Sequence, residues 1–125
     1  MAEVARPILV DSDIVIDHLR GVRKLPPPPL AYSVITRCEL FAGRDDPSRL
    51  RQVLSPLHEI PIDQEIAERG GVLRRDVQVP TPDALIAATA LVHELPLMTR
   101  NRRHFERVRG LSLLAPDSQP EPGGL

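Results

Sequence analysis

The chain has 125 residues, 42% of them hydrophobic, which suits a single domain with its own core. Its formal net charge of −1 excludes binding through a generally polybasic surface. Its cationic residues are almost all arginine, with Lys24 as the only lysine, and this bias is compatible with an RNA partner. A single cysteine, Cys38, excludes a disulfide framework, and no apolar run reaches membrane-spanning length, so we expect a soluble cytoplasmic protein without membrane contact.

The first predicted element is a buried strand at residues 8–10, where three aliphatic residues follow a proline. A helix is predicted directly after it, with Ser12 or Asp13 as the N-cap. Asp11 is therefore expected at the carboxyl end of a buried strand, where ligands gather in open α/β sheets. The alternative role for Asp11 is that of a helix cap.

The middle of the chain begins with four prolines, residues 26–29, which predict a stiff extended connector. Apolar spacing and the residues that start and end helices then predict further elements. These are strands at 31–34 and 58–62, helices at 35–42, 46–54 and 63–75, and a short extended piece at Val77 and Val79.

A strong helix start follows at Thr81-Pro82-Asp83, with Thr81 as the expected N-cap. The helix over residues 84–92 is apolar nearly all round and should be buried. Strands are predicted at 95–99 and 111–114, with a short helix between them that Asn101 caps. Residues 1–115 are expected to form one domain and 116–125 a disordered tail. The alternation of strands and helices predicts an α/β fold with a central parallel sheet covered on both faces.

Four polar residues stand where strands end or where helices face the core: Asp11, Glu39, Asp83 and Asn101. Parallel strands bring such positions to one edge of a sheet, so we expect these side chains to converge. Each also has a structural alternative. Glu39 could form a capping box with Thr36, Asp83 could complement the dipole of its helix, and Asn101 could act only as an N-cap.

Convergence of the carboxylates points to a bound cation. Two charges about 6 Å apart at an effective dielectric of about 20 repel by roughly 3 kcal/mol, so three clustered carboxylates need a counterion. Oxygen ligands without clustered histidine or cysteine favour Mg²⁺ or Mn²⁺ over zinc. One or two such ions can activate water and stabilise an in-line displacement at phosphorus, which predicts phosphodiester hydrolysis.

Four segments of the sequence together resemble the PIN-domain ribonucleases, and within them the VapC toxins of VapBC toxin–antitoxin pairs. The segments are Leu9–Gly21, Ser33–Gly43, Pro82–Ala90 and Met98–Phe105, in order and at compatible spacing. The resemblance covers nearly the whole chain. It implies a PIN-like three-layer α/β/α fold with a central parallel sheet.

The resemblance also implies a function, a Mg²⁺- or Mn²⁺-dependent endoribonuclease. The catalytic and metal-binding positions of the family fall on Asp11, Glu39, Asp83 and Asn101, with Thr99 nearby. The implied partners are a VapB-like antitoxin, a second copy of the chain in a homodimer, and an RNA substrate of the tRNA or rRNA class.

Recognition of RNA should depend on arginine, because only 2% of the residues are aromatic and base stacking is therefore a poor explanation. Candidates for phosphate contacts, with a solvated helix face as the alternative, are Arg100, Arg102, Arg103, Arg107 and Arg109. His104 is expected to pack or cap rather than to act as a general base.

Three other classes compete with this interpretation. Residues 8–15 also resemble the Asp-x-Asp start of haloacid dehalogenase-type phosphatases, and a receiver domain has a similar length. Both of these need a later lysine, whereas Lys24 comes too early. A catalytically silent PIN-like binding module is the third class, against which the intact acids argue.

Overall fold

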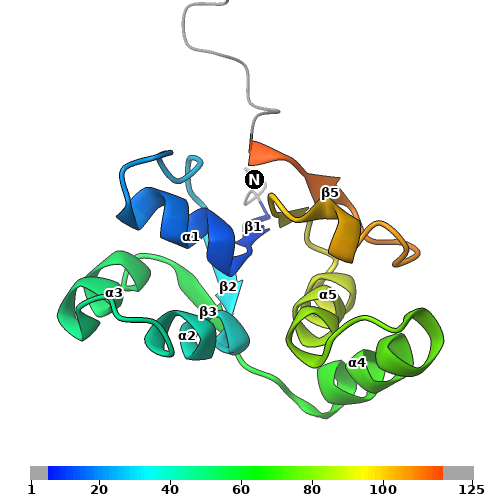
Figure 1. Ribbon diagram of the computed structural model, residues 1–125. Helices are drawn as coiled ribbons and strands as arrows, with labels where there is room; N and C mark the ends of the chain where they lie inside the picture. Colours follow the sequence, from blue (N-terminus) through cyan, green and yellow to red (C-terminus); the bar gives the residue numbers. More distant parts are fainter. Residues whose placement is uncertain (1–5, 117–125) are drawn as a thin grey trace, which may run out of the picture.

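Five short strands form one fully parallel sheet within residues 6–116, the part of the chain that the computed structural model describes (Figure 1). The order across the sheet is β3-β2-β1-β4-β5. The strands are β1 (Ile8–Val10), β2 (Leu30–Ser33), β3 (His58–Ile60), β4 (Leu97–Met98) and β5 (Leu113–Leu114). The helices are α1 (Ser12–Leu19), α2 (Val34–Phe41), α3 (Pro47–Leu54), α4 (Gln64–Val77), α5 (Thr81–His93) and a short 3₁₀ helix, η1 (Arg102–His104).

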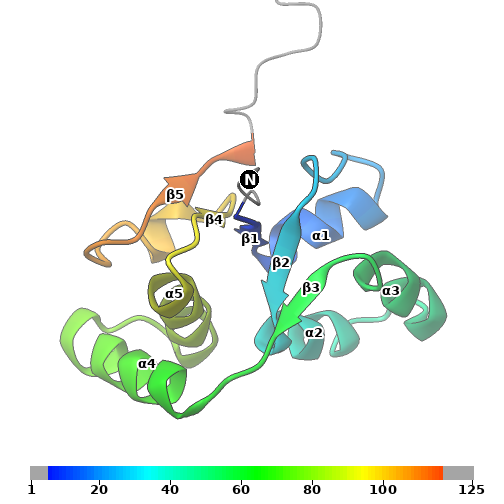
Figure 2. The ribbon, with the colours of Figure 1, turned by 180° about the vertical axis from the view of Figure 1, so that it is seen from behind.

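The sheet separates two helical layers, as Figures 1 and 2 show from opposite sides. Helices α1, α2 and α3 lie on one side, and α4 and α5 lie on the other. Successive strand residues face opposite layers: Leu9 joins the core formed with α4 and α5, whereas Val10 joins the core formed with α1 and α3. Leu97 and Met98 of β4 divide in the same way. The predicted three-layer α/β/α fold is confirmed.

The central position of β1 determines where the candidate site lies. Its neighbours are β2 and β4, and Val10 is in register with Met98. The residues that follow these strands, Asp11 and Thr99, therefore come to the same edge of the sheet. Strand β2 also ends at this edge and leads directly into α2, which carries Glu39.

Three local predictions are wrong. The N-cap of α1 is Asp11 rather than Ser12 or Asp13, because the strand passes into the helix without a linker and the Asp11 side chain accepts a hydrogen bond from the Ser12 amide. Thr81 is the first residue of α5 rather than its cap, and its hydroxyl instead contacts Arg74. Val77 ends α4 and so forms no extended piece with Val79.

The remaining elements occur close to their predicted places, with strands shorter than expected. Asp63 caps α4 through a 2.9 Å bond from the Ile66 amide. Among the described residues, no helix combines the length and the apolarity that crossing a membrane requires. Apart from Pro116, the predicted C-terminal tail lies outside the described residues.

Candidate functional site

A pocket of about 340 Å³ lies at the carboxyl edge of the sheet. It is bounded by the start of α1, by α2, by the start of α5 and by η1. All four residues singled out in the sequence line it: Asp11, Glu39, Asp83 and Asn101. Ser12, Asp13 and His104, to which the sequence assigned no part in such a site, line it as well. The folding of the chain thus collects carboxylates from three separate helices and their caps.

Asp11 is the most deeply buried of these acids, with 6% of its surface exposed. Its carboxylate accepts hydrogen bonds from the Ser12 amide and from the Thr99 hydroxyl, each 2.8 Å long. Burial raises the pKa of Asp11 to about 6, and the negative charges of Asp13 and Asp83 add to the shift, which the two hydrogen bonds oppose. Asp11 is therefore both a helix cap and an acid under electrostatic strain.

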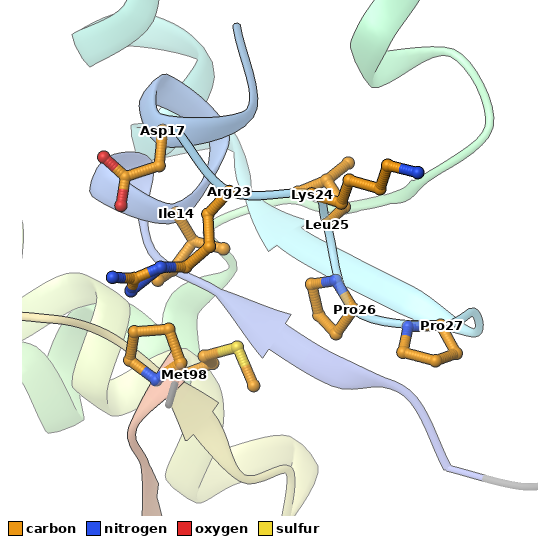
Figure 3. Close-up of a pocket in the computed structure, with 9 residues that line it drawn as sticks. Ile14, Asp17, Arg23, Lys24, Leu25, Pro26, Pro27 and Met98 are labelled. Carbon is orange, nitrogen blue, oxygen red and sulfur yellow. The ribbon is translucent and has the colours of Figure 1, made fainter. Parts of the chain in front are cut away.

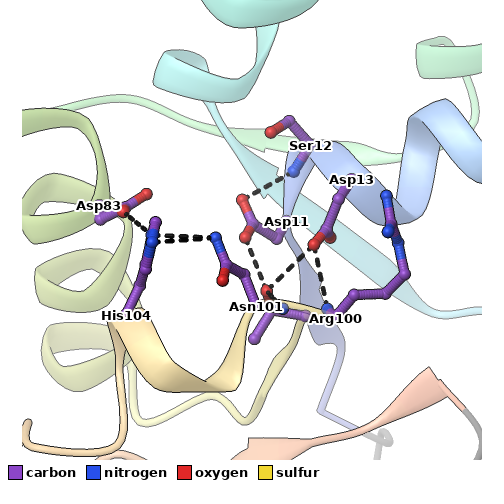
Figure 4. A network of polar contacts seen from close by, with 8 residues as sticks. Asp11, Ser12, Asp13, Asp83, Arg100, Asn101 and His104 are labelled. Carbon is purple, nitrogen blue, oxygen red and sulfur yellow. Dashed lines mark hydrogen bonds and ion pairs between the residues drawn. The ribbon is translucent and has the colours of Figure 1, made fainter.

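Asp13 ties the edge of the sheet to α1 (Figure 4). Its Oδ2 atom accepts a 3.0 Å bond from the Arg100 amide and lies 3.4 Å from the Thr99 hydroxyl. Burial raises the pKa of Asp13, and Arg100 opposes that rise. The other oxygen, Asp13 Oδ1, is buried and has no hydrogen-bond partner among the described residues. An orphaned carboxylate oxygen beside this pocket fits a site for a cation.

Arg100 is engaged with α1 rather than free to bind phosphate. Its Nε atom lies 2.9 Å from Oδ2 of Asp17, whose side chain is only 10% exposed. Together with its amide bond to Asp13, this ion pair holds the segment after β4 against α1. Of the predicted phosphate-binding arginines, Arg102 and Arg103 are exposed on η1, which also carries His104 into the pocket.

Glu39 reaches the pocket from α2. Although Glu39 as a residue is exposed, partial burial within the pocket raises the pKa of its carboxyl; the negative charges of Asp83 and Asp13 act in the same direction, and a hydrogen bond with the Ser12 side chain opposes them. The capping box with Thr36 does not form, because Ser33 caps α2 through a 3.0 Å bond from the Ile35 amide and Thr36 lies inside the helix. The structural alternative for Glu39 is thus wrong.

Asp83 and Asn101 are linked through one imidazole ring (Figure 4). The Nδ1 atom of His104 lies 2.8 Å from Oδ2 of Asp83 and 2.9 Å from the Asn101 side-chain nitrogen. His104, expected to pack or cap, is exposed, and its ring contacts these two polar side chains. Asn101 makes no side-chain cap bond to η1, although it occupies the cap position. The spacing of three residues from Asn101 to His104 is the one local signal that could have indicated their contact.

A second pocket, of about 360 Å³, lies between α1 and the proline run (Figure 3). Its one carboxylate, Asp17, is already paired with Arg100. Lys24 lines this pocket and not the acidic one. The lysine that phosphatases of the haloacid dehalogenase type and receiver domains need beside their aspartate is therefore missing from the acidic pocket. Both competing interpretations fail on that ground.

The donor set of the acidic pocket suits a hard cation. Three of its carboxyl groups, those of Asp11, Asp13 and Glu39, have pKa values raised by burial and by neighbouring negative charges, and a divalent ion stabilises such groups in their ionised form. However, no three Asp, Glu, His or Cys side chains within residues 6–116 lie close enough together to hold a metal ion. The carboxylates share a pocket but are not drawn together around one point.

Comparisons with known proteins agree on one family. Residues 8–111 match the family described as PIN domain. Ribonuclease VapC10 of Mycobacterium tuberculosis is 38% identical over 115 residues, covering 78% of this chain and 85% of the relative. Ribonuclease VapC1 of Methanocaldococcus jannaschii is 31% identical over 115 residues, covering 85% of this chain and 84% of the relative. A solved toxin–antitoxin complex from Klebsiella pneumoniae contains a chain that is 36% identical, with a TM-score of 0.74, covering 87% of this chain and 97% of that one.

Proposed function

The chain belongs to the PIN-domain family and is a ribonuclease toxin of the VapC type, and we propose that it cuts RNA by metal-dependent hydrolysis in the acidic pocket. The observation that carries this proposal is the convergence of Asp11, Glu39 and Asp83 on one pocket. Each of these acids enters from a different element, and Asp83 raises the pKa of both others. Stability alone gives no reason to collect charges that repel one another.

We assign the cation to Asp11, Glu39 and Asp83, with Asn101 as a fourth contributor and the orphaned oxygen of Asp13 beside them. Oxygen donors without cysteine favour Mg²⁺ or Mn²⁺. When bound, such an ion supplies an activated water and neutralises charge that develops on the phosphate. Binding it also relieves the repulsion among the acids.

The chain's own residues prepare this site in two ways. Thr99 and the Ser12 amide fix the carboxylate of Asp11, so that its position does not depend on the ion. We assign Arg102 and Arg103, which are exposed on η1 beside the pocket, to hold the phosphates that flank the bond to be cut. Arg100 has a structural role instead.

We further propose a VapB-like antitoxin as the partner, a homodimer as the active form and a structured RNA of the tRNA or rRNA class as the substrate. Membership of the family supports all three, and the relative from Klebsiella pneumoniae is itself part of a toxin–antitoxin complex. An antitoxin segment that carries a cation would complement the acidic pocket.

The experiment that tests the metal dependence is cleavage of total RNA by the purified chain with Mg²⁺ or Mn²⁺, with EDTA, and with the ion restored after EDTA. The proposal predicts cleavage that stops with EDTA and returns with either ion. Cleavage that continues in EDTA would refute the metal-dependent mechanism. Intact RNA under every condition would favour a catalytically silent binding module.

A further inference from the structure

His104 lines the acidic pocket and contacts two of the proposed metal-binding side chains, those of Asp83 and Asn101. It comes from η1, whereas Asp83 belongs to the first turn of α5, 21 residues earlier in the chain. Its Nδ1 atom lies 2.8 Å from Asp83 Oδ2 and 2.9 Å from the Asn101 side-chain amide. A single ring therefore governs the orientation of both side chains.

The chemistry of the contact determines which atom carries hydrogen. An ionised carboxylate only accepts hydrogen bonds, so Nδ1 of His104 must donate to Asp83. The neutral Nδ1–H tautomer and the imidazolium ion both carry this hydrogen, so the contact does not depend on protonation of the ring. Nδ1 then carries one hydrogen, directed at Asp83; Asn101 can share it by turning its carbonyl oxygen toward the ring, whereas its NH₂ group would face another donor.

We propose that His104 is a positioning residue, which fixes Asp83 through Oδ2 and leaves Oδ1 of that carboxylate for the cation. The proposal rests on the proposed function and deepens it. A carboxylate that binds a metal is commonly oriented by a hydrogen bond to its second oxygen, and loss of that bond typically weakens metal binding by about 10- to 100-fold. His104 thereby reduces the freedom that Asp83 must lose when the ion binds.

Two measurements on the full chain test this role. The first is calorimetric titration of the metal-free protein with Mn²⁺, comparing wild type with His104→Leu and His104→Asn. Leucine removes the donor, whereas the side-chain nitrogen of asparagine can take the place of Nδ1. His93→Leu is the control, because His93 is exposed at the other end of α5. We expect His104→Leu to weaken Mn²⁺ binding by about 10- to 100-fold, and His104→Asn to restore most of it.

The second measurement is the nitrogen NMR spectrum of the metal-free protein. We expect hydrogen on Nδ1 of His104, and we expect Asp83→Asn to shift this signal while that of His93 stays in place. The contact would be overturned if the neutral ring carried hydrogen only on Nε2 and its nitrogen signals did not shift in Asp83→Asn.

The titration has its own contrary outcomes. Unchanged Mn²⁺ affinity in His104→Leu would overturn the positioning role. Equal weakening in His104→Leu and His104→Asn would also overturn it, because a hydrogen-bond donor in the position of Nδ1 would then not account for the effect. A wild type that binds no Mn²⁺ would instead refute the proposed metal-dependent function, and the positioning role with it.

Discussion

Thr99 donates a 2.8 Å hydrogen bond to Oδ2 of Asp11 across 88 residues of sequence. Both residues are buried, and each follows one of two neighbouring parallel strands. The bond is charge-assisted and stabilises the ionised form of Asp11 against the cost of its burial. The bond therefore fixes a proposed metal-binding carboxylate to the residue that follows the neighbouring strand, β4.

Replacing Thr99 tests this relationship. Thr99→Val should lower the free energy of unfolding by about 1–3 kcal/mol at pH 7.5, because it leaves a buried carboxylate with one donor fewer. Thr99→Ser keeps the hydroxyl, so its free energy of unfolding should fall by less. Urea denaturation of the metal-free variants measures both values, and equal losses in the two variants would show that the hydroxyl is not what matters.

The pKa of Asp11 predicts an unusual pH dependence of stability without metal. Its value is about 6 in the folded chain and about 3.8 without the fold, so the folded state holds the proton more tightly. The free energy of unfolding should therefore fall as the pH rises from about 4 to about 6, by at most about 3 kcal/mol from this group. Asp13 and Glu39, whose pKa values are also raised, act in the same direction.

Asp11→Asn provides the check. Asparagine keeps one oxygen that can cap α1 by accepting from the Ser12 amide, and its NH₂ group can donate to the Thr99 hydroxyl, but it carries no charge. In EDTA at pH 7.5 this variant should be more stable than wild type by about 1–3 kcal/mol, and its stability should change less between pH 4 and 6. Wild type should regain stability on adding Mn²⁺, whereas the variant should not. A variant that is no more stable than wild type in EDTA would contradict the claim that the buried charge of Asp11 destabilises the metal-free fold.

The arginines near the site should separate into structural and RNA-binding groups. Arg100→Met removes the partner of the nearly buried Asp17 and should cost about 1–2 kcal/mol of unfolding free energy, a moderate value because the Arg100 side chain is half exposed. Arg103→Met, at an exposed position, should change stability by less than about 0.5 kcal/mol but weaken RNA binding and reduce its salt dependence. Denaturation and binding titrations at several salt concentrations measure the two effects. The reverse pattern would mean that Arg100 faces the RNA.

Two adjacent glycines in α4 test the packing of α4 on α5. A Cβ atom at Gly71 would meet nothing within 4 Å, so Gly71→Ala should stabilise the protein by about 0.5–1 kcal/mol through helix propensity. A Cβ atom at Gly70 would lie 2.9 Å from Cδ2 of Leu85, which would have to move. Gly70→Ala should therefore stabilise the protein less than Gly71→Ala does. Thermal denaturation compares them, and a larger gain at Gly70 would contradict the observed packing.

The sequence predicts the fold well because the relevant signals are local. Three aliphatic residues followed directly by Asp11 indicate a strand that ends in a polar residue, and the alternation of such strands with helices leads to a parallel sheet. Helix caps are less predictable, since a cap depends on what else its side chain can reach. Thr81 contacts Arg74 and so caps nothing.

The candidate site was predicted only in part, for a different reason. Asp11, Glu39 and Asp83 stand out because carboxylates at strand ends or on apolar helices need an explanation. The parts played by Asp13 and His104 depend on contacts with residues 87 and 21 positions away, which no spacing within one segment encodes. The sequence does not distinguish Arg100 from the other arginines of this segment for the same reason, because its ion pair with Asp17 exists only in the folded chain.

The most direct test of the central claim compares RNA cleavage by variants inside and outside the acidic pocket. Asp83→Asn and Glu39→Gln alter the proposed site, whereas Asp76→Asn and Glu65→Gln make the same chemical changes at exposed positions on α4. All are assayed on total RNA with saturating Mn²⁺. Loss of cleavage by at least about 100-fold in the two pocket variants, with wild-type cleavage in the two controls, is the predicted result. Wild-type cleavage by Asp83→Asn and Glu39→Gln would place the chemistry elsewhere and contradict the account.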